Sequence, residues 1–150
     1  SGDVLFDGSA VEAIRTRLVP LADLVTPNLD EVAVLLGVRP ASEAAMIDAA
    51  RRLVGELGAR AVLVKGGHLD GDDVIDVLHD GSATQCFRRR RIATRHTHGT
   101  GCTLSAAIAA RLALGDSLGL AVTAALEFVH RAIATAPGLG GGHGPLNHWA

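Results

Sequence analysis

Hydrophobic residues in the first part of the chain recur every three or four positions, which is the spacing of an amphipathic helix. The pattern predicts helices over residues 10–19, 28–37 and 42–58. Ser9 and Ser42 are suitable N-caps for the first and third helices, and Gly37 and Gly58 are suitable ends for the second and third. Residues 23–26, "DLVT", form a short β-like run between the first two helices.

The middle of the chain changes to strand-like patterns. The run "AVLVKGG", residues 61–67, is continuously apolar before its lysine, which is typical of a strand buried on both faces. Two alternating runs then flank Asp80-Gly81 and predict a hairpin with a two-residue turn. Two longer helices follow, from Cys102 to Leu114 and from Ser117 to Ala134, before a glycine-rich tail beyond residue 137.

This order of elements predicts one α/β fold with helices layered on a sheet. The doubly buried run at 61–67 favours a largely parallel sheet, to which the hairpin adds an antiparallel pair. In such sheets ligands bind at the carboxyl ends of the strands. The turn before Cys102 is expected to lie at such a place.

Composition limits the classes of partner. With 150 residues and 48% hydrophobic content, we expect one compact unit with a real core. The net charge of -2 gives no general attraction to nucleic acid or to anionic membranes, so an anion must be bound locally. Two cysteines without a CxxC pair, no signal peptide and no apolar run of about 18 residues indicate a soluble cytoplasmic protein.

The segment "HGTGCT", residues 98–103, is the strongest candidate site. Gly99 and Gly101 allow a sharp turn that leaves the N–H groups of Gly99 to Cys102 pointing together at the start of a helix. This arrangement describes an anion hole, and the helix terminus would also stabilise a Cys102 thiolate. The structural alternative is a glycine-rich connection followed by a buried cysteine.

Two further places could serve a phosphate. Lys65 is the only lysine and follows Val64, so no GxxxxGK[ST] loop exists, yet its ammonium at a strand end could reach a phosphate. In "TPNLDE", Glu31 could hold water on Mg²⁺ while Asn28 faces the phosphates. The structural alternatives are a lysine that snorkels to solvent and a capping box that only begins a helix.

Other chemistry remains open at this stage. His96, His98 and Cys102 could form a zinc cluster, although no fourth ligand is evident, and Cys102 with a histidine could act as a Cys–His hydrolase. The run "FRRRR" is expected to be a solvated edge strand, with contact to a nucleotide or an acidic partner as the alternative.

Four segments in this order, "VTPNLDEVAVLLG", "AVLVKGGH", "HTHGTGCTLSAAIAA" and "GGGHGPLNHW", resemble the C-terminal part of the hydroxymethylpyrimidine/phosphomethylpyrimidine kinases. These enzymes are ribokinase-like kinases. "GTGC" is the most specific segment, because most ribokinase-like relatives carry aspartate where this chain has Cys102. The resemblance extends from Ser1 to the last residues.

The resemblance implies the C-terminal portion of a three-layer α/β/α sandwich, with residues 1–150 as the nucleotide-side part and the N-terminal part absent. It implies an enzyme of thiamine biosynthesis that uses ATP and Mg²⁺ to phosphorylate 4-amino-5-hydroxymethyl-2-methylpyrimidine and then its monophosphate. By motif match, the roles are a catalytic base at Cys102, an anion hole at Gly99, Thr100 and Gly101, phosphate and metal contacts at Asn28 and Glu31, and a nucleotide contact at Lys65.

Two other functions remain open. One is a related vitamin kinase such as a pyridoxal kinase; the pyrimidine-binding part of the family, which has no counterpart in this chain, would decide this. A non-catalytic fragment or binding module could also keep the fold. We expect either a homo-oligomer, such as a dimer, or pairing with the missing N-terminal part.

Overall fold

A computed structural model describes residues 8–150. The chain divides into two compact units, Ser1–Arg91 and Ile92–Ala150, where length and composition favoured one. Each unit has helices of its own, and the three strands lie in the first. Among residues 8–150, no helix combines the length and the apolar character needed to cross a bilayer.

The helices of the first unit lie close to their predicted positions. The expected first helix is broken into an α-helical, a π-helical and a 3-10 segment, and it begins one residue before its expected cap, Ser9. The next two helices end at Gly37 and Gly58, both in the left-handed conformation that glycine permits. The elements are α1 Gly8–Ala13, η1 Ile14–Leu18, η2 Val19–Leu21, α2 Leu29–Leu36 and α3 Glu43–Leu57.

The sheet corrects the sequence prediction. Its strands are β1 Val62–Lys65, β2 Asp73–His79 and β3 Thr84–Arg90, in the order β1-β2-β3, and both pairings are antiparallel. The prediction of a largely parallel sheet was therefore wrong for residues 8–150. Val62, Leu63 and Val64 are fully buried as predicted, but burial on both faces does not encode the direction of the neighbouring strand.

In the first unit, parallel pairing is found beside β1, where residues 25–28 run along the strand. Val25 pairs with Val62 and Asn28 pairs with Lys65 as isolated parallel bridges. The backbone N–H of Lys65 donates to Pro27 O at 2.8 Å, and Leu63 N–H donates to Val25 O at 2.8 Å. This pairing brings the start of α2 to the end of β1.

The turn between β2 and β3 has Gly81 and Ser82 at its centre, one residue later than predicted. Asp80 N–H donates to Ala83 O at 3.1 Å, and the Asp80 carboxylate accepts the N–H groups of Ser82 and Ala83. The aspartate side chain therefore closes the turn, and Gly81 takes the left-handed conformation.

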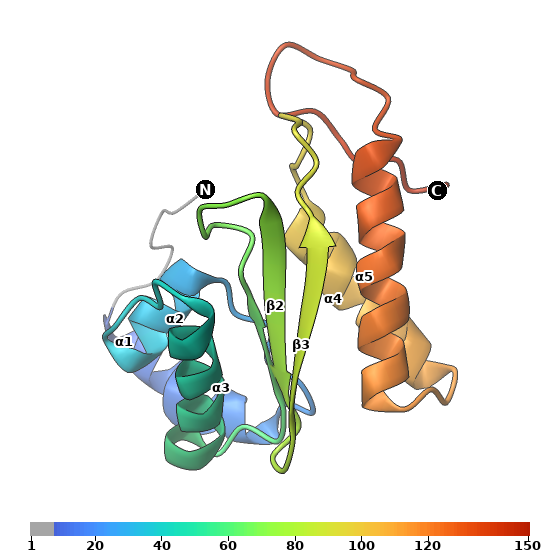
Figure 1. Cartoon of the computed structure of the whole chain (residues 1–150). Helices are drawn as coiled ribbons and strands as arrows, with labels where there is room; N and C mark the ends of the chain where they lie inside the picture. The colour runs from blue at the N-terminus through green and yellow to red at the C-terminus, as the bar shows by residue number, and fades with distance from the viewer. Residues whose placement is uncertain (1–7) are drawn as a thin grey trace. The chain divides into compact units, whose positions relative to one another are not determined.

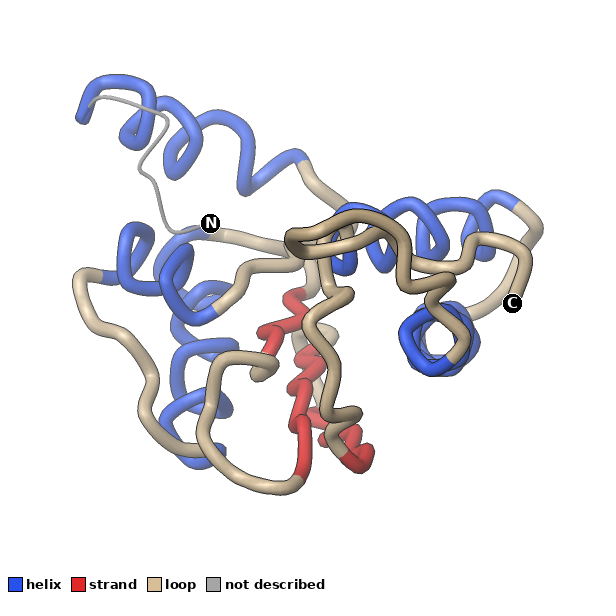
Figure 2. The backbone as a smooth tube through the Cα atoms, turned by 90° about the horizontal axis from the view of Figure 1, so that it is seen from above, coloured by secondary structure: helices blue, strands red, loops and turns tan. Residues whose placement is uncertain are grey.

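The core of the first unit lies between the sheet and the helices on one of its faces (Figure 1). Figure 2 shows the strands (red) with the helices of this unit (blue) gathered beside them. Fully buried side chains from α2, α3 and the strands fill this space, which agrees with the apolar faces predicted for these elements. They include Leu29, Val32, Met46, Leu53, Val64 and Val77.

The second unit consists of α4 Thr100–Ala113, α5 Leu118–Ala134 and a tail without regular helix or strand. α4 begins two residues before the predicted start, so Cys102 is its third residue. The tail is nevertheless held in place: Pro145 forms a parallel bridge with His98, and His143 Nδ1 lies 3.0 Å from Arg95 O. The end of the chain is thereby tied to the segment that precedes α4.

Candidate functional site

The N-terminus of α2 is closed by a complete capping box. The Asn28 side-chain oxygen accepts the N–H groups of Asp30 at 2.9 Å and Glu31 at 2.8 Å, and Glu31 Oε2 accepts the N–H of Asn28 at 2.6 Å. The structural interpretation of "TPNLDE" is therefore confirmed. The cap does not use every polar group of the motif, because the Asn28 Nδ2 group and the second Glu31 oxygen have no part in it.

Lys65 lies beside this helix start. Its backbone pairs with Asn28 through the parallel bridge, and its Nζ lies 3.9 Å from Glu31 Oε2. The Lys65 side chain is 19% exposed, so the stem is covered and the ammonium remains reachable. We call Asn28, Glu31 and Lys65 the α2 cluster; the structure brings together all three candidate residues of the first unit.

Residues that follow Lys65 are fixed by a buried carboxylate. Asp76, opposite Lys65 in β2, accepts the N–H of Gly66 at 3.0 Å and pairs with Arg89. Burial raises the pKa of Asp76, while Arg89 and the Gly66 N–H act against this shift. A side chain at Gly66 would overlap the carbonyl oxygen of Ile75, so only glycine fits there.

The four arginines of "FRRRR" do not form a freely solvated face. Arg88 pairs with Glu43, Arg89 with Asp76, and Arg90 lies 3.9 Å from Asp72, whereas Arg91 donates to backbone carbonyl groups. The expectation of a solvated strand therefore holds best for Arg90, whose side chain is 79% exposed. The pattern of the sequence alone could not assign these partners, which lie up to 45 residues away.

The turn before α4 has the geometry of an anion site. Gly99 is the N-cap in the left-handed conformation, with φ of 83°, and no side chain caps the helix. Among residues 8–150, no acceptor takes the backbone N–H groups of Gly101 and Cys102. The N–H of Thr100 differs, because it donates to Thr97 O at 3.3 Å, as does the Thr100 hydroxyl at 2.6 Å. Two open donors therefore lie at the positive end of a 14-residue helix.

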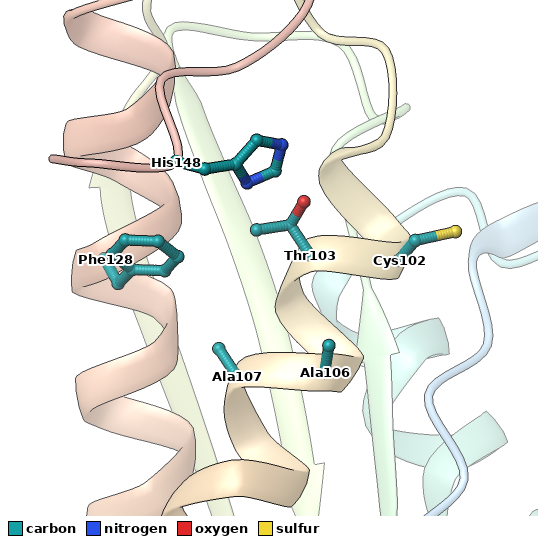
Figure 3. A pocket seen from close by; sticks show the side chains of 6 residues that line it. All are labelled: Cys102, Thr103, Ala106, Ala107, Phe128 and His148. Carbon is teal, nitrogen blue, oxygen red and sulfur yellow. The ribbon is translucent and has the colours of Figure 1, made fainter.

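Cys102 is exposed, which contradicts the alternative of a buried cysteine. It borders a hollow of about 390 Å³ that is also lined by Thr103, Ala106, Ala107, Phe128 and His148. Figure 3 shows the Cys102 side chain pointing away from Phe128 and His148. Neither Phe128 nor His148 was a candidate site residue: Phe128 lies outside every motif, and His148 lies in the segment "GGGHGPLNHW", which was used only for the family resemblance.

The His, Cys, Asp and Glu side chains of the described residues give limited support for metal binding. Among the described residues, no three His, Cys, Asp or Glu side chains come together as a ligand group, and this includes His96, His98 and Cys102. Mg²⁺ needs fewer protein ligands than zinc, because it commonly keeps several waters and binds phosphate oxygens. Glu31, with one oxygen outside the cap, fits this lesser role.

Comparison with known proteins gives the family. The family model for phosphomethylpyrimidine kinase matches residues 1–147. A hydroxymethylpyrimidine/phosphomethylpyrimidine kinase of Streptomyces coelicolor is 51% identical over 150 residues, which cover 99% of this chain and 55% of that protein. The thiamine biosynthesis bifunctional protein ThiED of Geobacter sulfurreducens is 50% identical over 147 residues, which cover 98% of this chain and 30% of that protein.

Solved structures agree with this assignment at the level of the fold. An ADP complex of Bacillus subtilis pyridoxal kinase matches with a TM-score of 0.91 and 38% identity, over 97% of this chain and 57% of that one. A phosphomethylpyrimidine kinase of Clostridium difficile matches with a TM-score of 0.73 and 31% identity, over 87% of this chain and 52% of that one. The chain spans about half the length of most of these relatives, and it belongs to the phosphomethylpyrimidine kinase family.

Proposed function

We propose that the chain is the C-terminal, nucleotide-side part of a ribokinase-like kinase domain that phosphorylates hydroxymethylpyrimidine and then its monophosphate in thiamine biosynthesis. The observation that carries this proposal is the pair of open backbone N–H groups, of Gly101 and Cys102, at the N-terminus of α4. Such a terminus favours a phosphate through both hydrogen bonds and the helix dipole. Family membership supports the class of acceptor.

The proposed division of roles follows from phosphoryl-transfer chemistry. This reaction needs positioning and charge stabilisation more than covalent participation of the protein. In the anion hole at Gly99, Thr100 and Gly101, the turn would present the open N–H groups of Gly101 and Cys102 to the charge that develops on the transferred group, while the Thr100 N–H stays bound to Thr97 O. Lys65 would place its ammonium near the nucleotide phosphates, and Asn28 would donate through its Nδ2 group.

Magnesium is the one cofactor besides ATP that the proposal requires. Bound Mg²⁺ would neutralise phosphate charge during transfer. In this chain Glu31 would hold a water of the ion through the oxygen that the capping box leaves free. The other Glu31 oxygen accepts the Asn28 N–H, which orients the carboxylate, and lies 3.9 Å from Lys65 Nζ.

Cys102 is proposed as the base for the first of the two transfers. The hydroxymethyl group of the pyrimidine must lose a proton as it attacks, whereas a phosphate acceptor, with a second pKa of about 6, is already ionised at neutral pH. Cys102 is exposed at the third position of α4, directly beside the open donors. The same helix terminus would serve both steps, and the thiol only the first.

A second candidate function is phosphorylation of pyridoxal. The observation that favours it is the similarity of the fold to the ADP complex of Bacillus subtilis pyridoxal kinase, with a TM-score of 0.91. Pyridoxal also carries a hydroxymethyl group on an aromatic nitrogen ring, so the same anion hole and base would suit it. The acceptor is selected by contacts that the described residues do not identify.

The test is an acceptor comparison on the complete protein that contains this chain. ADP release is measured with MgATP and each of three acceptors: hydroxymethylpyrimidine, its monophosphate and pyridoxal. We expect turnover with both pyrimidines and a kcat/KM for pyridoxal at least about tenfold lower, which corresponds to about 1.4 kcal/mol of discrimination. Turnover with pyridoxal alone would replace the first proposal by the second, and no transfer to any acceptor would contradict both.

A further inference from the structure

Arg91, the residue after β3, binds the loop that follows Lys65 by all three of its guanidinium nitrogens. Nε donates to Gly71 O at 2.9 Å, Nη1 to Gly67 O at 2.8 Å and Nη2 to Leu69 O at 2.5 Å. The backbone N–H of Arg91 also donates to Asp72 O at 2.7 Å. A planar fork of charged donors suits three carbonyl oxygens in a way that a lysine ammonium does not.

The other end of the same loop, residues 66–72, is fixed independently. Gly66 N–H donates to the buried carboxylate of Asp76, and Leu69 N–H donates back to Gly66 O at 2.9 Å. Leu69 also packs against the hydrophobic core of the unit. Together with the hydrogen bonds from Arg91 to Gly67, Leu69 and Gly71, these contacts give the loop one defined path from β1 to β2.

Loop 66–72 lies next to the α2 cluster: it follows Lys65 in the chain and contacts the first turn of α2. Lys65 immediately precedes Gly66, and His68 Nδ1 lies 3.6 Å from Asp30 Oδ2. Asp30 is the neighbour of Glu31 in the first turn of α2, and a hydrogen bond from Arg39 lowers its pKa below the usual range. The bridge to Asn28 holds the Lys65 backbone, so a change in the path of the loop would act on the Lys65 side chain and on the contact of His68 with Asp30.

We propose that Arg91 is a positioning residue for the α2 cluster: by holding the carbonyl groups of loop 66–72, it sets the place of Lys65 against Glu31. Arg91 acts through the loop, because each of its guanidinium nitrogens already has a protein acceptor. The consequence for phosphate binding rests on the proposed function. The effect on Lys65 itself does not, and the two are measured separately.

The test uses the 150-residue chain and four proteins: wild type, Arg91→Met, Arg91→Lys and the control Arg90→Met. The Arg90→Met control removes one positive charge from the position next to Arg91. The Arg90 side chain makes only an exposed contact with Asp72, at 3.9 Å, so its loss should leave the loop unchanged. Amide hydrogen exchange reports on loop 66–72 in all four. Because Lys65 is the only lysine, ¹³Cε-lysine labelling gives one signal that reports on its surroundings in wild type and in both methionine variants.

We expect Arg91→Met to raise exchange rates in the loop by about tenfold or more and to shift the Lys65 signal, with Arg90→Met close to wild type in both. Arg91→Lys keeps the charge without the fork, so its loop should exchange almost as fast as that of Arg91→Met. Unchanged exchange in Arg91→Met, an unmoved Lys65 signal, or equal effects in Arg90→Met would each overturn the proposal.

Titration with ADP in the presence of Mg²⁺ adds the functional consequence. We expect binding to Arg91→Met to be weaker by about tenfold than binding to wild type or to Arg90→Met. Equal ADP affinity in all proteins would show that Arg91 stabilises loop 66–72 without an effect on nucleotide binding. If wild type itself fails to bind ADP, the proposed role of the α2 cluster in this chain is contradicted, and the exchange and lysine measurements still decide the role of Arg91.

Discussion

Nζ of Lys65 lies 3.9 Å from Oε2 of Glu31, the same oxygen that accepts the backbone N–H of Asn28 at 2.6 Å. One carboxylate therefore has a structural task at the start of α2 and a charged neighbour at the end of β1. A helix cap and a metal ligand require different properties of this carboxylate. The cap needs an acceptor oxygen, whereas Mg²⁺ prefers a negative charge.

Glu31→Gln separates these tasks. Glutamine can still accept the N–H of Asn28, so we expect the free energy of unfolding to change by no more than about 0.5 kcal/mol. Magnesium-dependent phosphoryl transfer by the complete protein should fall by about tenfold or more, because the charge is lost. Glu31→Ala is the control that also removes the cap and should cost about 1 kcal/mol of stability. Full activity of Glu31→Gln would leave Glu31 with the cap alone.

Gly99→Ala tests the turn before α4, and Gly115→Ala provides a matched control. Both glycines have positive φ, 83° and 96°, and neither has an atom within 4 Å of the added methyl group. Each substitution should cost about 1 to 2 kcal/mol of stability from backbone strain. Only Gly99→Ala should weaken ADP binding in calorimetric titration, since only Gly99 precedes the open donors. Equal affinities of the two variants would argue against the anion hole.

Cys102→Ser in the complete protein tests the base. Serine keeps the backbone donors and the helix terminus but offers no group that titrates near neutrality. We expect phosphorylation of the pyrimidine alcohol to slow by about 10²-fold or more, and that of the monophosphate far less. Rate constants for both acceptors between about pH 6 and pH 9 provide the measurement. An equal loss on both would mean that Cys102 shapes the turn, and no loss would remove it from the mechanism.

Asp80 should make stability depend on pH in the acid range. Backbone N–H groups of Ala83 and Ser82 lower the pKa of Asp80 from 3.8 to about 2. Because the folded value is the lower one, the stabilisation is full above 3.8 and is lost as the pH falls through about 2. Asp80→Asn keeps an acceptor oxygen but does not titrate. Its melting temperature should therefore fall less steeply than that of wild type over this range, and parallel curves would contradict the prediction.

Local features of the sequence predicted much of the fold. The capping box at Asn28 and Glu31, the glycine ends of α2 and α3, and the strand at Val62–Lys65 are all present, because each depends on residues only a few positions apart. The direction of the sheet could not be predicted in this way. The continuous apolar run and the burial of β1 are compatible with either direction of the neighbouring strand, and the long-range pairing with β2 is antiparallel.

The candidate site shows the same division. The motif at residues 98–103 identified a helix start with glycine turns, but only the structure shows that the Thr100 N–H donates to Thr97 O while the N–H groups of Gly101 and Cys102 are open. Likewise, Lys65 was a candidate because of its strand end, but only the structure shows that a parallel bridge brings its backbone to Asn28 and that its Nζ lies 3.9 Å from Glu31 Oε2. Arg91 gave no signal of its role, because its acceptors are backbone carbonyl groups 20 or more residues earlier.

The glycine-rich tail has a practical consequence for anyone who trims or extends this chain. A side chain at Gly144 would overlap His96 Nδ1 and lie 2.7 Å from Leu139 O, and the next residue, Pro145, pairs with His98 just before the turn at Gly99. A truncation chosen because the tail has low sequence complexity would thus delete packing partners of the segment that leads into α4. Any shortened or fused form should retain the tail through Leu146, which is buried.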